Sequence, residues 1–166
     1  MGPKGTFSSE ACEHFNKNIS FIPCLSFDIL KNNFENKKID YILLPIFNNI
    51  TGNINVLKNE NYTLLGKINH KINLAILSPN IELIKNKEMI IYSHPQAYLE
   101  VKSKLKKLYP EHKFIETKST FKACLKAISE NQYSLASINN QSIFMNKINN
   151  EELEKDNITE FGLYKI

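Results

Sequence analysis

Residues 88–109, EMIIYSHPQAYLEVKSKLKKLY, change from one hydrophobic pattern to another at their sixth residue. The run 88–93 is short, apolar and rich in β-branched and aromatic side chains, which predicts a strand. From Pro95 onward, apolar residues recur at helical spacing through 95–109, and proline is well tolerated in the first turn of a helix. The stretch therefore predicts a strand that leads directly into a helix.

The same alternation of strands and helices runs along the rest of the chain, without internal repeats. It favours an α/β fold with mostly parallel strands. The apolar run 62–77 is long enough to pass from one lobe to another. Strands are predicted over 20–24, 40–46 (ending at Pro45), 62–77, 88–93, 113–117, 133–137 and 158–166; helices are predicted over 27–38 (capped by Ser26), 95–109 and 119–130, and 139–148 continues the alternation.

Length and composition limit the class of protein. A chain of 166 residues suits one compact domain or two small lobes. It has no membrane-length apolar run and no basic-then-apolar leader, so we expect a cytoplasmic protein with no membrane partner. The three cysteines, Cys12, Cys24 and Cys124, are too scattered for a metal site, as are the histidines, and they indicate reduced thiols. No metal and no cofactor are expected.

The charge pattern argues against a nucleic-acid partner. The net charge is +4, yet none of the 21 basic residues is Arg. The lysines alternate with Asp and Glu, whereas nucleic-acid binders concentrate basic residues on one face and use Arg to read base edges. We therefore expect a small-molecule ligand.

Polar residues gather where predicted strands lead into helices. The clusters lie at 6–8, 48–49, 93–96 and 117–120. Hydroxyls, amides and the unpaired N–H groups of a helix N-terminus suit a carboxylate or phosphate. Taken singly, each cluster has a structural explanation: Ser8 and Ser119 are good N-caps, and His94 before a proline would close a loop. Together they favour an anion site.

Several segments together carry a family resemblance. They are GPKGTFSSEA (2–11), IPCLSF (22–27), DYILLPIFNNITGNIN (40–55), YSHPQA (92–97), TKSTFKAC (117–124), SLAS (134–137) and the tail from DN (156–157). In order and spacing they resemble the prephenate dehydratase catalytic domain over nearly the whole chain. That resemblance implies two α/β lobes of the periplasmic-binding-protein type II kind, with prephenate held in the cleft between them. The lobes would comprise about 1–73 with 155–166, and about 74–154, without the phenylalanine-sensing ACT domain.

The resemblance and the junction clusters together give a set of candidate site residues. His94 is the candidate catalytic residue. Because Arg is absent, Lys4 and Lys118 are candidates to help bind the substrate carboxylates. Candidate substrate-binding residues are Thr6, Phe7, Ser8, Phe47, Asn48, Asn49, Ser93, Gln96, Thr117, Ser119 and Thr120.

Two motifs depart from the family pattern. Pro45–Asn49 reads PIFNN where dehydratases carry PIENS or PVENS, and Phe47 and Phe7 are expected to make the cleft drier than one with the family's Glu. The family's Thr-Arg-Phe falls on Gly162, Leu163 and Tyr164 in an ungapped alignment, which we prefer. With a three-residue deletion it falls on 159–161, reading Thr-Glu-Phe. The Arg is absent under either alignment.

These departures leave three readings open. The preferred one is a non-aromatising prephenate decarboxylase of secondary metabolism, as in antibiotic biosynthesis, because hydroxide leaves poorly without a proton donor. The alternative is a divergent prephenate dehydratase that uses Thr159 and serves phenylalanine biosynthesis. The third is a non-catalytic module that binds a small carboxylate. The family resemblance alone implies a homodimer, and phenylalanine is expected neither to bind nor to inhibit.

Overall fold

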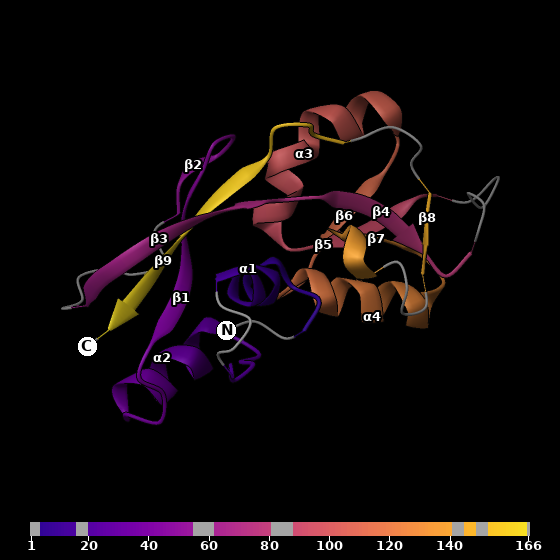
Figure 1. The fold of residues 1–166 in the computed structure, drawn as a ribbon. Helices are drawn as coiled ribbons and strands as arrows, with labels where there is room; N and C mark the ends of the chain where they lie inside the picture. Colours follow the sequence, from indigo (N-terminus) through magenta and orange to yellow (C-terminus); the bar gives the residue numbers. More distant parts are fainter. Residues whose placement is uncertain are drawn as a thin grey trace. The chain divides into compact units, whose positions relative to one another are not determined.

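The computed structural model describes residues 4–15, 20–54, 62–80, 88–140, 145–148 and 153–165 (Figure 1). The chain divides into two compact units, Met1–Ile72 with Asn157–Ile166, and Asn73–Asp156. Among these described residues each unit has its own β-sheet and two α-helices, so each is described by itself.

The sheet of the first unit is antiparallel throughout. Its strand order is β2-β1-β9-β3, so that β9, from the end of the chain, lies between β1 and β3. The elements are α1 (Phe7–Phe15), α2 (Phe27–Glu35), β1 (Ile42–Asn48), β2 (Gly52–Asn53), β3 (Thr63–Lys71) and β9 (Ile158–Lys165).

The two helices of this unit cover opposite faces of the sheet. Successive side chains of a strand point to opposite faces, and the buried residues of β1 follow this rule. Ile42 and Leu44 pack with Leu30 and Phe34 of α2. Leu43 packs with Ala11 of α1 and with Phe161 of β9. Thr159 precedes Phe161 by two residues and therefore lies on the α1 face.

The sheet of the second unit is mixed. Its order is β6-β5-β7-β4-β8. Strand β5 is parallel to β6 and β7, and β4 is antiparallel to β7 and β8. The elements are β4 (Leu74–Ser78), β5 (Ile90–Ser93), α3 (Pro95–Leu108), β6 (Lys113–Glu116), α4 (Thr120–Glu130), β7 (Tyr133–Ser137), the 3₁₀ turn η1 (Ile138–Asn140) and β8 (Asn146–Lys147).

The structure corrects three expectations about the strands. The strands are not mostly parallel, because within the described ranges parallel pairing is confined to β5 with its two neighbours. Residues 20–24 form no strand; Cys24 instead packs its side chain into the core beside α2. Strand β1 does not end at Pro45, since a register shift between Pro45 and Phe47 accommodates the proline and pairing continues to Asn48. Of the stretch 139–148, residues 141–144 lie outside the described residues.

Two of the three serines predicted as N-caps, Ser26 and Ser119, cap their helices, and Ser8 does not. Ser26 accepts a hydrogen bond from the Ile29 N–H, and Ser119 accepts one from the Lys122 N–H. Ser8 is not a cap, because α1 begins at Phe7 and the preceding Thr6 accepts from the Ser9 N–H.

Replacing the Ser119 cap should destabilise the second unit. Ser119→Ala removes the acceptor at the start of α4 and is expected to lower the free energy of unfolding by about 1 kcal/mol. Ser129→Ala is the matched control, because the Ser129 hydroxyl only donates to a carbonyl within the same helix. It should change stability by less than about 0.5 kcal/mol in denaturant titrations. Equal effects of the two variants would contradict the capping role.

Candidate functional site

The Asn48 side chain ties the end of β1 to the start of β9. It is fully buried, and its Nδ2 donates to Asn157 Oδ1 at 2.7 Å and to Thr159 Oγ1 at 3.0 Å. Its Oδ1 accepts from the backbone N–H groups of Ile50 and Thr51 at 2.9 and 3.1 Å. Because Oδ1 is held by two N–H donors, the orientation of the amide is fixed, with nitrogen toward β9.

This arrangement determines what the Thr159 hydroxyl can do. A primary amide has only donors on its nitrogen, so Thr159 Oγ1 must be the acceptor of the bond from Asn48. The hydrogen of the Thr159 hydroxyl makes no bond to any other described residue, although Thr159 is only 4% exposed. The bond from Asn48 therefore fixes the Thr159 hydroxyl oxygen and leaves its hydrogen available for donation to a ligand.

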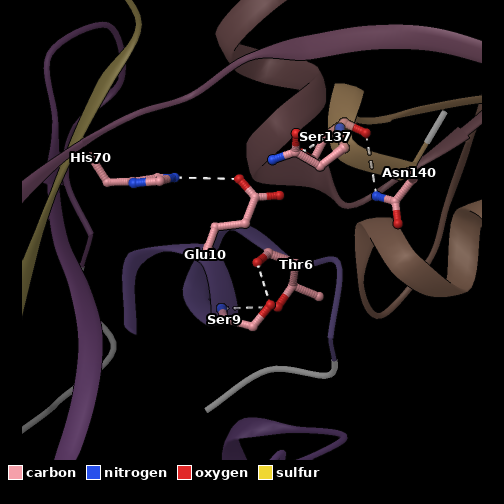
Figure 2. A network of polar contacts seen from close by, with 7 residues as sticks. Thr6, Ser9, Glu10, His70, Ser137 and Asn140 are labelled. Atoms are coloured by element: carbon pink, nitrogen blue, oxygen red, sulfur yellow. Dashed lines mark hydrogen bonds and ion pairs between the residues drawn. The ribbon is translucent and has the colours of Figure 1, made fainter. Parts of the chain in front are cut away.

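A titratable pair lies on the same face of this sheet. Figure 2 shows the Glu10 carboxylate of α1 facing the His70 ring of β3, with 3.3 Å between Oε2 and Nε2. Gly5, at φ +85°, turns the chain into α1, a backbone conformation that favours glycine. Thr6 then caps the helix, and the Ser9 hydroxyl donates to the Thr6 carbonyl at 2.8 Å (Figure 2). Glu10 follows Thr6 by one helical turn.

In the second unit, polar groups gather at one edge of the sheet. Strands β6, β5 and β7 are parallel neighbours, so their carboxyl ends meet there. The Ser93 hydroxyl donates to the Leu135 carbonyl at 2.7 Å, and the Thr117 N–H donates to the Ser93 carbonyl at 2.8 Å. The Ser137 carbonyl accepts from Asn140 Nδ2 at 3.3 Å (Figure 2).

His94 caps α3 at this edge. Its Nδ1 accepts from the Gln96 N–H at 3.2 Å, which requires an unprotonated Nδ1. Burial lowers the pKa of His94, and the charge of Glu116 opposes that shift. A neutral imidazole that shapes the loop is a poor proton donor near neutral pH. The geometry therefore favours the loop-closing role over the catalytic one.

The structure places the candidate site residues in two groups, one in each unit. Phe7 and Ser8 are half-buried at the start of α1, and Asn49 is exposed, its Oδ1 accepting from the Ile158 N–H. Gln96 lies in the first turn of α3. Lys4 and Lys118 are exposed. Thr6, Phe7, Ser8, Phe47, Asn48 and Asn49 belong to the first unit; Ser93, His94, Gln96, Thr117, Ser119 and Thr120 meet at the sheet edge of the second.

Phe47 does not share a wall with Asn48. Its register partner on β9 is Glu160, whereas Asn48 pairs with Thr159. Since neighbouring strand residues point to opposite faces, Phe47 faces away from Thr159, and it is 41% exposed. Phe47 therefore lies on the other face of the sheet from Asn48 and Thr159. That Phe47 makes the site drier stays a prediction.

Sequence reasoning missed His70, Asn157, Ser137 and Asn140. His70 carries no motif, and only the pairing of β3 with β9 brings it to the level of Thr159. Ser137 and Asn140 lie at and just after the end of the predicted strand 133–137. Searching the carboxyl ends of predicted strands for polar residues, as was done for the other junctions, would have found them.

None of the described helices is long and apolar enough to cross a bilayer. In the same residues, no three His, Cys, Asp or Glu side chains gather as metal ligands.

Asn48→Ala should be strongly destabilising. It leaves two backbone N–H groups and the Asn157 amide oxygen without the partner that Asn48 supplies. We expect a loss of about 3 kcal/mol in the free energy of unfolding, from several buried groups losing a partner at once. Asn49→Ala is the control at an exposed neighbour and should cost about 1 kcal/mol. Similar losses in the two variants would contradict the central role of Asn48.

The lowered pKa of His94 makes stability depend on pH. As the pH falls below about 6.5, the unfolded chain takes up a proton on this residue before the folded one does. Stability supplied by the neutral ring is therefore lost on acidification. His94→Asn retains a capping side chain and should flatten the fall in unfolding free energy between about pH 7.5 and pH 5.

Comparisons with known proteins extend over nearly the whole chain. The family profile described as prephenate dehydratase matches residues 1–164. A bifunctional chorismate mutase/prephenate dehydratase of Buchnera aphidicola subsp. Schizaphis graminum is 35% identical over 98% of this chain and 45% of its own length. The chain thus spans less than half of that curated relative.

Solved structures confirm the predicted fold class, α/β lobes of the periplasmic-binding-protein type II kind. Prephenate dehydratase from Arthrobacter aurescens in complex with L-Phe matches with a TM-score of 0.78 at 17% identity, covering 99% of this chain and 58% of that chain. The regulatory domain of HypT from Salmonella typhimurium matches with a TM-score of 0.50 at 10% identity, covering 98% and 82%. The family matches favour the dehydratase reading over the decarboxylase. The chain belongs to the prephenate dehydratase family.

Proposed function

We propose that the chain is a carbon–oxygen lyase that converts prephenate to phenylpyruvate, carbon dioxide and water. Family membership supports the substrate class. The observation that carries the reaction type is the Thr159 hydroxyl, which Asn48 holds as an acceptor so that its hydrogen is available to a ligand. A donor of this kind at the ring hydroxyl distinguishes dehydration from simple decarboxylation.

The chemistry explains why such a donor matters. In dehydration, the bond from the ring to its carboxylate breaks, and its electron pair enters the ring as a new double bond. The ring hydroxyl departs with the electrons of its own bond and takes up one proton to leave as water. A hydrogen bond to that hydroxyl holds it in the leaving orientation and stabilises charge developing on oxygen. Without it, the hydroxyl would be retained.

The geometry supports Thr159, rather than position 162, as the counterpart of the family threonine. A Cβ at Gly162 would lie 2.8 Å from Tyr164 Cε2 and 3.0 Å from Leu64 Cδ1, so a side chain there would displace both. Tyr164 itself packs against the α2 core. We therefore adopt the alignment with the three-residue deletion in place of the ungapped one.

The replacement of the family arginine does not alter the face that carries Thr159. Under the adopted alignment the arginine position is Glu160, which pairs with Lys67 at 2.8 Å on the half-exposed opposite face of the strand. The decarboxylase reading depended on the loss of both Thr and Arg. Since Thr159 is present and held, only the loss of the arginine remains, and the dehydratase is the better reading.

Thr159→Val should abolish most of the dehydration. Valine keeps the shape but removes the hydroxyl, so we expect kcat for phenylpyruvate formation to fall about 100-fold or more. Thr159→Ser keeps the hydroxyl and should retain most activity. Product is measured as the aromatic enolate absorbance after incubation with prephenate.

The wild-type product decides between the readings. Phenylpyruvate supports the dehydratase. Release of carbon dioxide with a non-aromatic product would overturn it in favour of the decarboxylase, and binding of unchanged prephenate would indicate the non-catalytic module. Full activity in Thr159→Val would remove Thr159 from the mechanism.

A further inference from the structure

A row of three side chains crosses the sheet of the first unit. Thr159 of β9 pairs with Asn48 of β1 on one side and with His70 of β3 on the other. Directly opposed residues of antiparallel strands lie on the same face, with Cβ atoms about 5 Å apart. The hydroxyl assigned to the leaving group therefore has an imidazole as its other neighbour in the sheet.

The His70 ring is fixed in place by contacts with its neighbours. Its side chain is 13% exposed and that of Glu10 is 15% exposed, so the bond between them is largely sheltered from water. The ring also makes edge contacts with Phe161 and with His14. His70 Nδ1 is buried and makes no hydrogen bond among the described residues. Buried polar atoms are rarely left in this way without a functional reason.

Glu10 determines which ring nitrogen remains available. A carboxylate accepts hydrogen bonds, so the proton of His70 nearest to Glu10 sits on Nε2 (Figure 2). The remaining nitrogen, Nδ1, is the one without a partner, and it carries the second proton when the ring is cationic.

The proposed reaction needs such a group. An aliphatic hydroxyl holds its proton too tightly to be an efficient acid near neutral pH, where effective acids have a pKa near the working pH. Thr159 can orient the leaving hydroxyl, but another side chain must supply the proton. His94 is unsuited because its Nδ1 is committed to capping α3.

We propose that His70, held by Glu10, is the proton donor for the dehydration, an inference that rests on the proposed function. The imidazolium gives its Nδ1 proton to the ring oxygen as the carbon–oxygen bond breaks, and the oxygen leaves as water. The electron pair of the breaking bond to the carboxylate enters the ring, and carbon dioxide departs. The neutral imidazole is reprotonated before the next turnover.

The experiment compares steady-state phenylpyruvate formation by the whole chain and its His70 variants. His70→Gln keeps a polar side chain without a titrating ring and should lower kcat about 100-fold with KM changed little. His70→Ala should be similarly slow and should recover activity when free imidazole is added. A merely structural role would not give rescue by imidazole. Glu10→Gln, which keeps a hydrogen-bonding group, should lower kcat less than His70→Gln.

His112→Gln is the matched control, because the His112 ring contacts Tyr98 and has no part in the pair of Glu10 and His70. It should leave kcat unchanged. If the wild type forms phenylpyruvate and His70→Gln keeps its kcat, the proton-donor assignment is overturned while the dehydratase stands. If His70→Ala is slow but imidazole does not restore it, the assignment is also overturned. If the wild type forms no phenylpyruvate, the proposed function fails, and the donor role fails with it.

Discussion

The buried amide of Asn48 is the constraint on which the first unit depends. One side chain satisfies five polar groups: two N–H groups and the Thr51 hydroxyl of the turn after β1, the Asn157 amide and the Thr159 hydroxyl. Its partners Asn157, just before β9, and Thr159, on β9, lie 109 and 111 residues away in the chain. A buried polar network of this kind specifies one register, because a slip by one residue would leave several groups without partners. The same network orients the hydroxyl of the proposed site.

The two units present polar groups by different physical means. In the second unit, parallel strands bring loops and helix N-termini to one edge, where hydroxyls and N–H groups gather. In the first unit, antiparallel strands place side chains from three strands in a row across one face. The helix N-termini at the sheet edge of the second unit suit recognition of an anion. The row of side chains on the sheet of the first unit suits precise placement of hydrogen-bond donors and acceptors.

Much of the fold was predictable from local patterns, because strand and helix periodicities and cap residues such as Ser26 and Ser119 act over a few residues. Strand direction was not, since the antiparallel pairing of β9 with β1 and β3 involves residues far apart in sequence. The same limit applies to the site. The junction residues of the second unit follow strands that predict them, whereas His70 becomes a neighbour of Thr159 only through the sheet register. The alignment of Thr159 could be chosen only once its bond to Asn48 was known.

The position of β9 has a consequence for how the chain acquires its structure. The second unit is continuous in sequence, Asn73–Asp156, whereas the sheet of the first needs a central strand from beyond residue 156. During synthesis from the N-terminus, β1 and β3 emerge long before the strand that joins them. The second unit can therefore fold on the ribosome while the first waits with two unpaired strand edges, a state open to misassociation. Closing so long a loop also slows folding. The row of side chains that forms the proposed site therefore exists only after β9 has joined β1 and β3.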